Sequence, residues 1–153
     1  MRFRILNCRE VKEIRKMLKE QYGVEEKIEY VFLRMPNDKV YITNRDLEFI
    51  ELDRLRINTI GLYFGEIAHG KIRLSVSGCQ IVGPLANKNM YEMDDKEVRL
   101  FFEGGQVEGE NAFVDGVFVL MKHRGDFVGM GQYKKEKILN YLNKSYRAKE
   151  LII

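Results

Sequence analysis

Cysteine is scarce in this sequence, with only Cys8 and Cys79 among 153 residues. Their number and spacing exclude a disulfide framework and the C-x-x-C half of a metal site. Histidine is equally rare, and a zinc site would need both cysteines to converge with His69 and His123. We therefore expect reduced thiols, no metal and no other cofactor.

Long apolar runs are also missing. No stretch reaches the roughly 18 apolar residues that a membrane-spanning helix needs, and the N-terminal MRFRILNCREVK lacks the apolar region of a signal peptide. These absences predict a cytoplasmic protein that does not bind membranes. Because 45% of the residues are apolar, the chain can still bury a sizeable core.

The N-terminal part begins with a clear helix signal. Asn7 can cap a helix whose apolar stripe includes Ile14 and Leu18, and Gly23 can end it. The helix has a second face in water, which includes Lys12, Arg15, Lys16 and Lys19.

A hairpin and a second helix follow. Residues 27–35 and 39–43 are predicted strands, and the Pro-Asn-Asp sequence at 36–38 favours a turn between them. A short helix is predicted near residues 44–50. Residues 1–53 thus form a small α/β subdomain, which is too small to stand alone and is expected to pack on residues 54–153.

The stretch 57–78 predicts a strand, a polar loop bracketed by Gly65 and Gly70, and a second strand at 71–74. In the second strand Lys71 and Arg73 alternate with apolar residues, as in a half-buried strand. Ser75 or Ser77 can then cap an apolar helix over 76–86. The groove between this helix and the second strand can hold a phosphate, with Lys71, Arg73 and Lys88 beside it.

The next part reads as mixed strands and turns. A strand is predicted at 90–93, and Asp94 and Asp95 then stand at the start of a helix, where acids are favourable. The apolar runs at 117–121 and 127–129 flank a charged turn and predict a hairpin.

The positive charge is concentrated near the C-terminus. Residues 133–150 hold six cations and two acids, so the whole net charge of +3 can be assigned to this segment. Its apolar positions favour a helix over 134–149. Three tyrosines are interleaved with the cations, a composition that suits a polyanion with stackable bases. The cations that we expect to contact phosphates are Lys134, Lys135, Lys137, Lys144 and Arg147.

The order of these segments resembles a known domain. The blocks GLYFGEIAHGKIRLSVSG, VRLFFEGGQVEG and GVFVLMKHRGDFVGMGQYKK resemble the PUA-like RNA-binding domain of Sun/Fmu-type RNA cytosine-5 methyltransferases. They are also similar to the PUA domain of the Nip-type ribosome assembly factors. The NDKVY sequence looks like a hairpin in the N-terminal domain of that second family.

The resemblance implies an α+β protein in which the small N-terminal subdomain packs on a PUA-like pseudo-barrel with flanking helices. It implies binding of structured RNA, such as rRNA or tRNA, in ribosome biogenesis or RNA modification. It places Lys71, Arg73 and the basic C-terminal segment at the RNA. The methyltransferase relatives carry a Rossmann-like catalytic domain, whereas no G-x-G here follows a strand at the start of a βαβ unit, since Gly129-x-Gly131 closes a late hairpin. We therefore expect a stand-alone, non-enzymatic RNA-binding protein.

Two alternatives remain open at this stage. One is an adaptor that supplies a PUA-like domain in trans to an RNA methyltransferase or a ribosome assembly protein, with contact surface from the aromatic residues at 101, 102, 113 and 118. The other is a small enzyme that uses Cys79 with His69, or Asp94 and Asp95 with a metal ion.

The RNA-binding hypothesis makes a geometric demand. The C-terminal cations and the groove beside Lys71 and Arg73 must share one side of the molecule, so that one RNA backbone can touch both.

Overall fold

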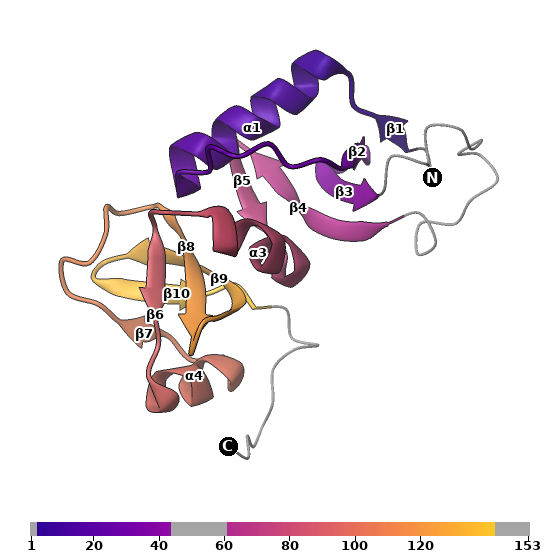
Figure 1. Ribbon diagram of the computed structural model, residues 1–153. Coiled ribbons are helices and arrows are strands. Elements are labelled where there is room, and N and C mark those ends of the chain that lie inside the picture. Colours follow the sequence, from indigo (N-terminus) through magenta and orange to yellow (C-terminus); the bar gives the residue numbers. More distant parts are fainter. Residues whose placement is uncertain (1–2, 44–60, 143–153) are drawn as a thin grey trace.

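Two sheets with helices packed on them make up this α+β fold, which the computed structural model describes for residues 3–43 and 61–142 (Figure 1). Within these residues the first sheet has the strand order β1-β2-β3-β4-β5 and the second has the order β6-β8-β9-β10-β7. The strands of the first sheet are β1 (Arg4–Ile5), β2 (Val31–Arg34), β3 (Lys39–Thr43), β4 (Leu62–Ala68) and β5 (Lys71–Leu74). Those of the second are β6 (Met90–Glu92), β7 (Val107–Glu108), β8 (Phe118–His123), β9 (Asp126–Lys134) and β10 (Lys137–Asn140).

Helix α1 (Cys8–Tyr22) begins and ends where the sequence predicts. The Asn7 side chain accepts a hydrogen bond from the Glu10 amide at 2.9 Å, and the Glu10 carboxylate accepts one from the Asn7 amide. Gly23 ends the helix in a left-handed conformation, with φ of 72°. The stripe that includes Ile14 and Leu18 is buried against the first sheet.

The predicted strand at 27–35 is only partly correct, because β2 begins at Val31. The preceding segment runs alongside α1. Val24 and Ile28 are buried in the same cluster as the helix stripe. This segment is therefore anchored by packing beside α1, and pairing with β3 starts only at Val31.

The polar loop predicted between Gly65 and Gly70 is wrong. Strand β4 continues to Ala68, and the turn to β5 consists of His69 and Gly70, with φ of 52° and 74°. Two successive positive φ values are the mark of a two-residue hairpin turn whose twist matches that of the strands.

Helix α3 (Val76–Val82) joins the two sheets, and a 3-10 turn, η3 (Gly83–Leu85), extends it (Figure 1). Ser75 is its cap, because the Ser75 Oγ accepts a hydrogen bond from the Gly78 amide at 3.0 Å. One buried cluster contains Phe64 of β4, Cys79 of α3 and Met130 of β9. The same apolar core therefore holds both sheets in place.

Helix α4 (Asp95–Phe102) packs against the second sheet and begins as predicted, with Asp94 as its cap in a capping box with Glu97. The predicted hairpin of apolar runs is confirmed as β8 and β9. None of the helices in the described ranges is long and apolar enough to cross a bilayer.

The predicted C-terminal helix over 134–149 is wrong in its described part. The chain turns at Lys135 and Glu136, with φ of 51° and 64°, and returns as β10, which pairs with β9 and β7. Ile138 is 1% exposed in this strand. Pairing on both sides of β10 and burial of Ile138 outweigh the local preference of the Lys- and Glu-rich sequence for a helix.

Three expectations lie outside the described residues. These are the short helix near 44–50, the boundary between residues 53 and 54, and the contacts of Lys144 and Arg147.

Candidate nucleic-acid interface

The outward face of β5 carries the two cations that the sequence singles out. Lys71 and Arg73 are exposed, whereas Ile72 and Leu74 are 0% and 3% exposed. This alternation confirms the prediction of a half-buried strand. The two cations therefore project from the same face, about 7 Å apart along the strand.

Arg73 lies in a cleft between the two sheets. The cleft has a volume of about 410 Å³, and we call it the Arg73 cleft. The Arg73 Nη2 atom is 3.2 Å from the Glu66 Oε2 atom, and its Cζ atom is 5.2 Å from the centroid of the Tyr141 ring. The guanidinium is thus positioned by a carboxylate on one side and an aromatic ring on the other. The cleft is lined by Lys39, Tyr63, Glu66, Arg73, Met130 and Tyr141, among others.

A second cation and a second aromatic ring line the Arg73 cleft, Lys39 from β3 and Tyr63 from β4. The Lys39 Nζ atom lies 5.7 Å from the centroid of the Tyr63 ring. Burial raises the pKa of the Tyr63 phenol, and the nearby Glu66 carboxylate raises it further. The phenol therefore remains neutral at physiological pH, so the Tyr63 side chain is uncharged and its ring can stack on another ring.

Lys71 borders a second, smaller cavity of about 290 Å³, which is also lined by His69 and Phe118. The Phe118 and Tyr141 rings, one from each cavity, are 6.1 Å apart between centroids. The two cavities therefore adjoin along this ring pair. Lys88 is exposed in the loop before β6 and lines neither cavity.

The predicted cations of the C-terminal segment lie elsewhere. Lys134, Lys135 and Lys137, which we call the hairpin tip, are exposed where β9 turns into β10. The Lys137 Nζ atom is 3.6 Å from the Glu108 Oε1 atom. Tyr141 follows the other end of β10, about 13 Å along the strand from Lys137 at the usual rise per residue. The hairpin tip and the Arg73 cleft thus stand at opposite ends of β10.

Sequence reasoning found Arg73 and Lys71 but missed Lys39 and Tyr63. Both missed residues lie in short strands whose partners are distant in sequence, because Tyr63 pairs with Tyr41 and Lys39 with Glu66. The available signal was the pairing of Lys39 in one predicted strand with a nearby strand that carries Tyr63. It becomes informative only when the register is known.

The residues proposed for catalysis have structural roles. Cys79 is 0% exposed and burial raises the pKa of its thiol well above the usual range, so no reactive thiolate is available. Asp94 caps α4, and Asp95 binds His123 and Arg124 at distances of 2.8 and 2.6 Å. Among the described residues no cluster of three or more His, Cys, Asp or Glu side chains is placed to hold a metal ion.

The four aromatic residues proposed for an adaptor surface are largely used in packing. Phe101 is 1% exposed, and Phe102, Phe113 and Phe118 are partly buried and pack against the buried clusters.

Comparison with known proteins confirms the resemblance to a methyltransferase PUA domain for the later two of the three sequence blocks. Residues 88–148 match the family model of the methyltransferase RsmF PUA domain. No curated protein matches the sequence. The fold is similar to the crystal structure of hypothetical protein PH0734.1 from the archaeon Pyrococcus horikoshii OT3, with a TM-score of 0.55 and 14% sequence identity over 97% of this chain and 89% of that chain. The chain therefore has a PUA-like α+β fold.

Proposed function

We propose that this protein binds structured RNA through the Arg73 cleft, without catalysis of its own, in RNA modification or ribosome assembly. The observation that carries the proposal is the clustering of two cations and two tyrosines, Lys39, Tyr63, Arg73 and Tyr141, in a cleft next to the segment that matches a PUA domain.

The cleft supplies the two interactions that single-stranded or looped RNA needs. Arg73 offers a planar set of donors to a phosphate, and Lys39 adds a second positive charge. The rings of Tyr63 and Tyr141 offer surfaces on which bases can stack. Glu66 holds the guanidinium in place before RNA arrives, so less side-chain freedom is lost on binding. Lys71 extends the positive surface beyond the Phe118 and Tyr141 ring pair.

The proposed partners are rRNA or tRNA, and a separate methyltransferase or assembly protein can act on the RNA that this chain holds. This assignment is supported by the kind of enzyme named in the family match. Binding of RNA comes first in this scheme, and contact with the second protein follows from it.

The test is binding of tRNA and of an rRNA stem-loop, measured by fluorescence anisotropy between about 50 and about 300 mM salt. We expect wild-type affinity to fall steeply with salt. Arg73→Gln should weaken binding about tenfold and lower the salt slope by about 0.7, since one phosphate contact is lost. Tyr141→Leu should weaken binding about tenfold with little change in slope, because stacking is largely independent of salt.

Lys96→Gln is the matched control. Lys96 is an exposed cation on α4, away from the cleft, and its removal changes the net charge by the same amount as Arg73→Gln. Equal losses in the Arg73 and Lys96 variants would contradict the proposal, as would the absence of RNA binding by the wild-type protein at low salt.

A further inference from the structure

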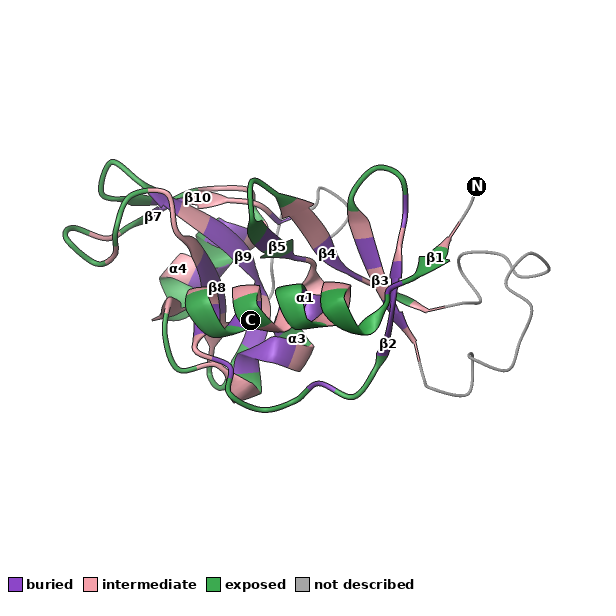
Figure 2. Ribbon diagram, turned by 90° about the horizontal axis from the view of Figure 1, so that it is seen from above, coloured by how far each residue is buried: buried purple, intermediate pink, exposed green. Residues whose placement is uncertain are grey.

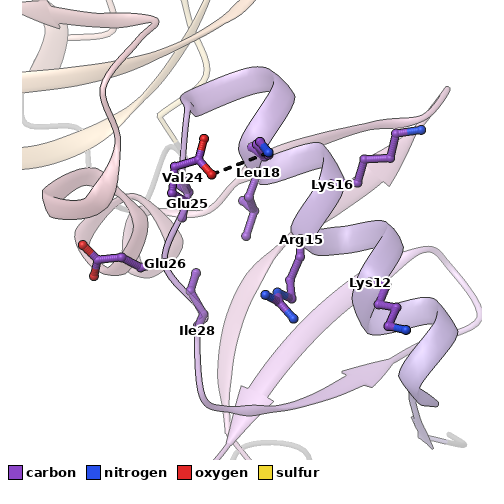
Figure 3. Close-up of a pocket in the computed structure, with 9 residues that line it drawn as sticks. Lys12, Arg15, Lys16, Leu18, Val24, Glu25, Glu26 and Ile28 are labelled. Atoms are coloured by element: carbon purple, nitrogen blue, oxygen red, sulfur yellow. Dashed lines mark ion pairs between the residues drawn. The ribbon is translucent and has the colours of Figure 1, made fainter.

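A second groove runs between α1 and the segment that leads into β2. Its two cavities have volumes of about 390 and about 300 Å³ and share Lys12, Arg15 and Ile28 in their linings. Figure 3 shows the end near Glu25, with Arg15 on the side of α1 that faces Ile28. We call this feature the α1 groove.

Charge is distributed unevenly along the α1 groove. At the end shown in Figure 3, Lys19 forms an ion pair with Glu25 at 3.5 Å. On the same helix Lys16 lies 3.9 Å from Glu20. The other cavity is lined by three cations, Lys12, Arg15 and Lys27, and by no carboxylate. Within the described ranges none of these three cations forms an ion pair. This end of the groove is therefore electropositive, although Glu25 and Glu26 line the adjoining cavity.

An exposed aromatic ring stands beside these cations. Tyr30 lines the same cavity and is 42% exposed. Most of the apolar floor is closed, since Leu6 and Ile28 are each 6% exposed and Phe32 is 1% exposed, although Ile5 in the same lining is 39% exposed. An apolar side chain docking here could cover Ile5 but would leave the three cations without partners, which disfavours an apolar ligand. A ring next to unpaired cations instead suits a base and its phosphates.

We infer that the electropositive end of the α1 groove is a second RNA contact, in which Lys12, Arg15 and Lys27 bind phosphates and Tyr30 stacks on a base. This inference rests on the proposed function and extends it. It assigns to the N-terminal half a binding role of its own.

The groove and the Arg73 cleft lie on different faces of the first sheet. Helix α1 packs on the face that carries Phe64 and Ile72. Arg73 follows Ile72 and Tyr63 precedes Phe64, and successive side chains in a strand point to opposite faces. One RNA that occupies both sites must pass around the sheet edge. A short oligonucleotide can fill only one site at a time.

The test compares Lys12→Gln/Arg15→Gln with Lys96→Gln/Arg99→Gln, which removes two exposed charges from α4 instead of α1. Each protein is titrated with a single-stranded RNA of about 30 nucleotides over a range of salt concentrations. We expect the α1 variant to lower the salt slope by about 1.4, at about 0.7 for each lost phosphate contact, and the α4 variant to leave it close to that of the wild type. Tyr30→Ser should weaken binding several-fold without a change in slope.

The outcomes separate the two proposals. If wild-type protein binds RNA and the α1 and α4 variants behave alike, the α1 groove is not an RNA contact, while the Arg73 cleft remains supported. If the α1 variant keeps its RNA affinity but loses binding to poly-glutamate that the wild type shows, the groove serves acidic peptides and the inference is overturned. If the wild type binds no RNA, the proposed function fails and the inference fails with it.

Discussion

Tyr22 is the residue that ties three elements together. Its side chain is 0% exposed at the end of α1, and its hydroxyl donates a hydrogen bond to the Ile72 carbonyl of β5 at 2.8 Å. The same hydroxyl lies 3.5 Å from the sulfur of Met130 in β9. Burial raises the pKa of this phenol well above its usual range, so it acts as a neutral donor.

Removal of this hydroxyl should have a measurable and limited cost. Tyr22→Phe should lower the free energy of unfolding by about 1 kcal/mol, the net value of a typical buried hydrogen bond. The cost stays limited because Gln21 Nε2 also donates to the Ile72 carbonyl, at 3.1 Å. Urea denaturation followed by circular dichroism measures the change. Tyr30→Phe removes an exposed hydroxyl and is the control, and an equal effect of the two substitutions would refute this role of Tyr22.

At the scale of single residues, the sequence predicts exposure better than function. The outward positions of Lys71 and Arg73 follow from alternation in β5, and the structure confirms them. The role of Tyr141 depends on its ring lying beside Arg73, 68 positions away in the sequence. Local patterns carry no information about such a contact.

At the scale of elements, α4 is held to the β8–β9 turn by charged side chains. Asp95 in the first turn of α4 is bound by both His123 and Arg124. The hydrogen bond with His123, and then the Arg124 guanidinium, hold the pKa of the Asp95 carboxyl below its usual range. The folded state therefore binds a proton at this carboxyl less readily than the unfolded state does.

This lowered pKa predicts a dependence of stability on pH. The stabilisation from Asp95 is complete above the usual carboxyl pKa of about 4 and is lost as the pH falls through the lower pKa of the folded state. Asp95→Asn should therefore be less stable than the wild type near pH 6, and the difference should shrink below about pH 4. Urea denaturation across this range provides the measurement. A difference that is constant with pH would contradict the assignment, and Asp115→Asn, at an exposed position with no ion pair among the described residues, is the control.

The elements that the sequence predicts are those with local signals. The Asn7 cap, the left-handed Gly23 and the Pro-Asn-Asp turn each determine a conformation within a few residues. The turn between β9 and β10 has Lys135 and Glu136 at positive φ, where Asn and Gly are the usual residues. That turn gives no signal in the sequence, and β10 is formed because β7 and β9 pair with it on either side.

At the scale of the whole molecule, the apolar core fixes the geometry of the Arg73 cleft. Residues of α1, α3 and both sheets share one buried cluster. In Figure 2 buried positions lie in strands of both sheets, including β9 and β2, while much of α1 is exposed. The strands of the first sheet on one side of the cleft and Tyr141 on its other side are therefore held in place by packing, so the cleft is preformed.

The sequence also predicts that the hairpin tip and Arg73 share one positive surface. In the described part of the structure these cations lie in different regions. Figure 2 shows β7 and β10 at the end of the molecule that is farthest from β1 and β2. The hairpin tip belongs to that end, whereas Arg73 lies near the middle, in β5. Net charge counted along a segment cannot reveal such a division, since strand direction decides where each cation lies.

The most direct test of the central claim is to map the RNA surface by nuclear magnetic resonance. Uniformly labelled protein is titrated with an unlabelled rRNA stem-loop, and backbone amide shifts are followed at low salt. If RNA occupies the Arg73 cleft, the largest shifts should fall at Tyr63, Arg73 and Tyr141. Shifts that are confined to the hairpin tip, with these three amides unchanged, would contradict the account.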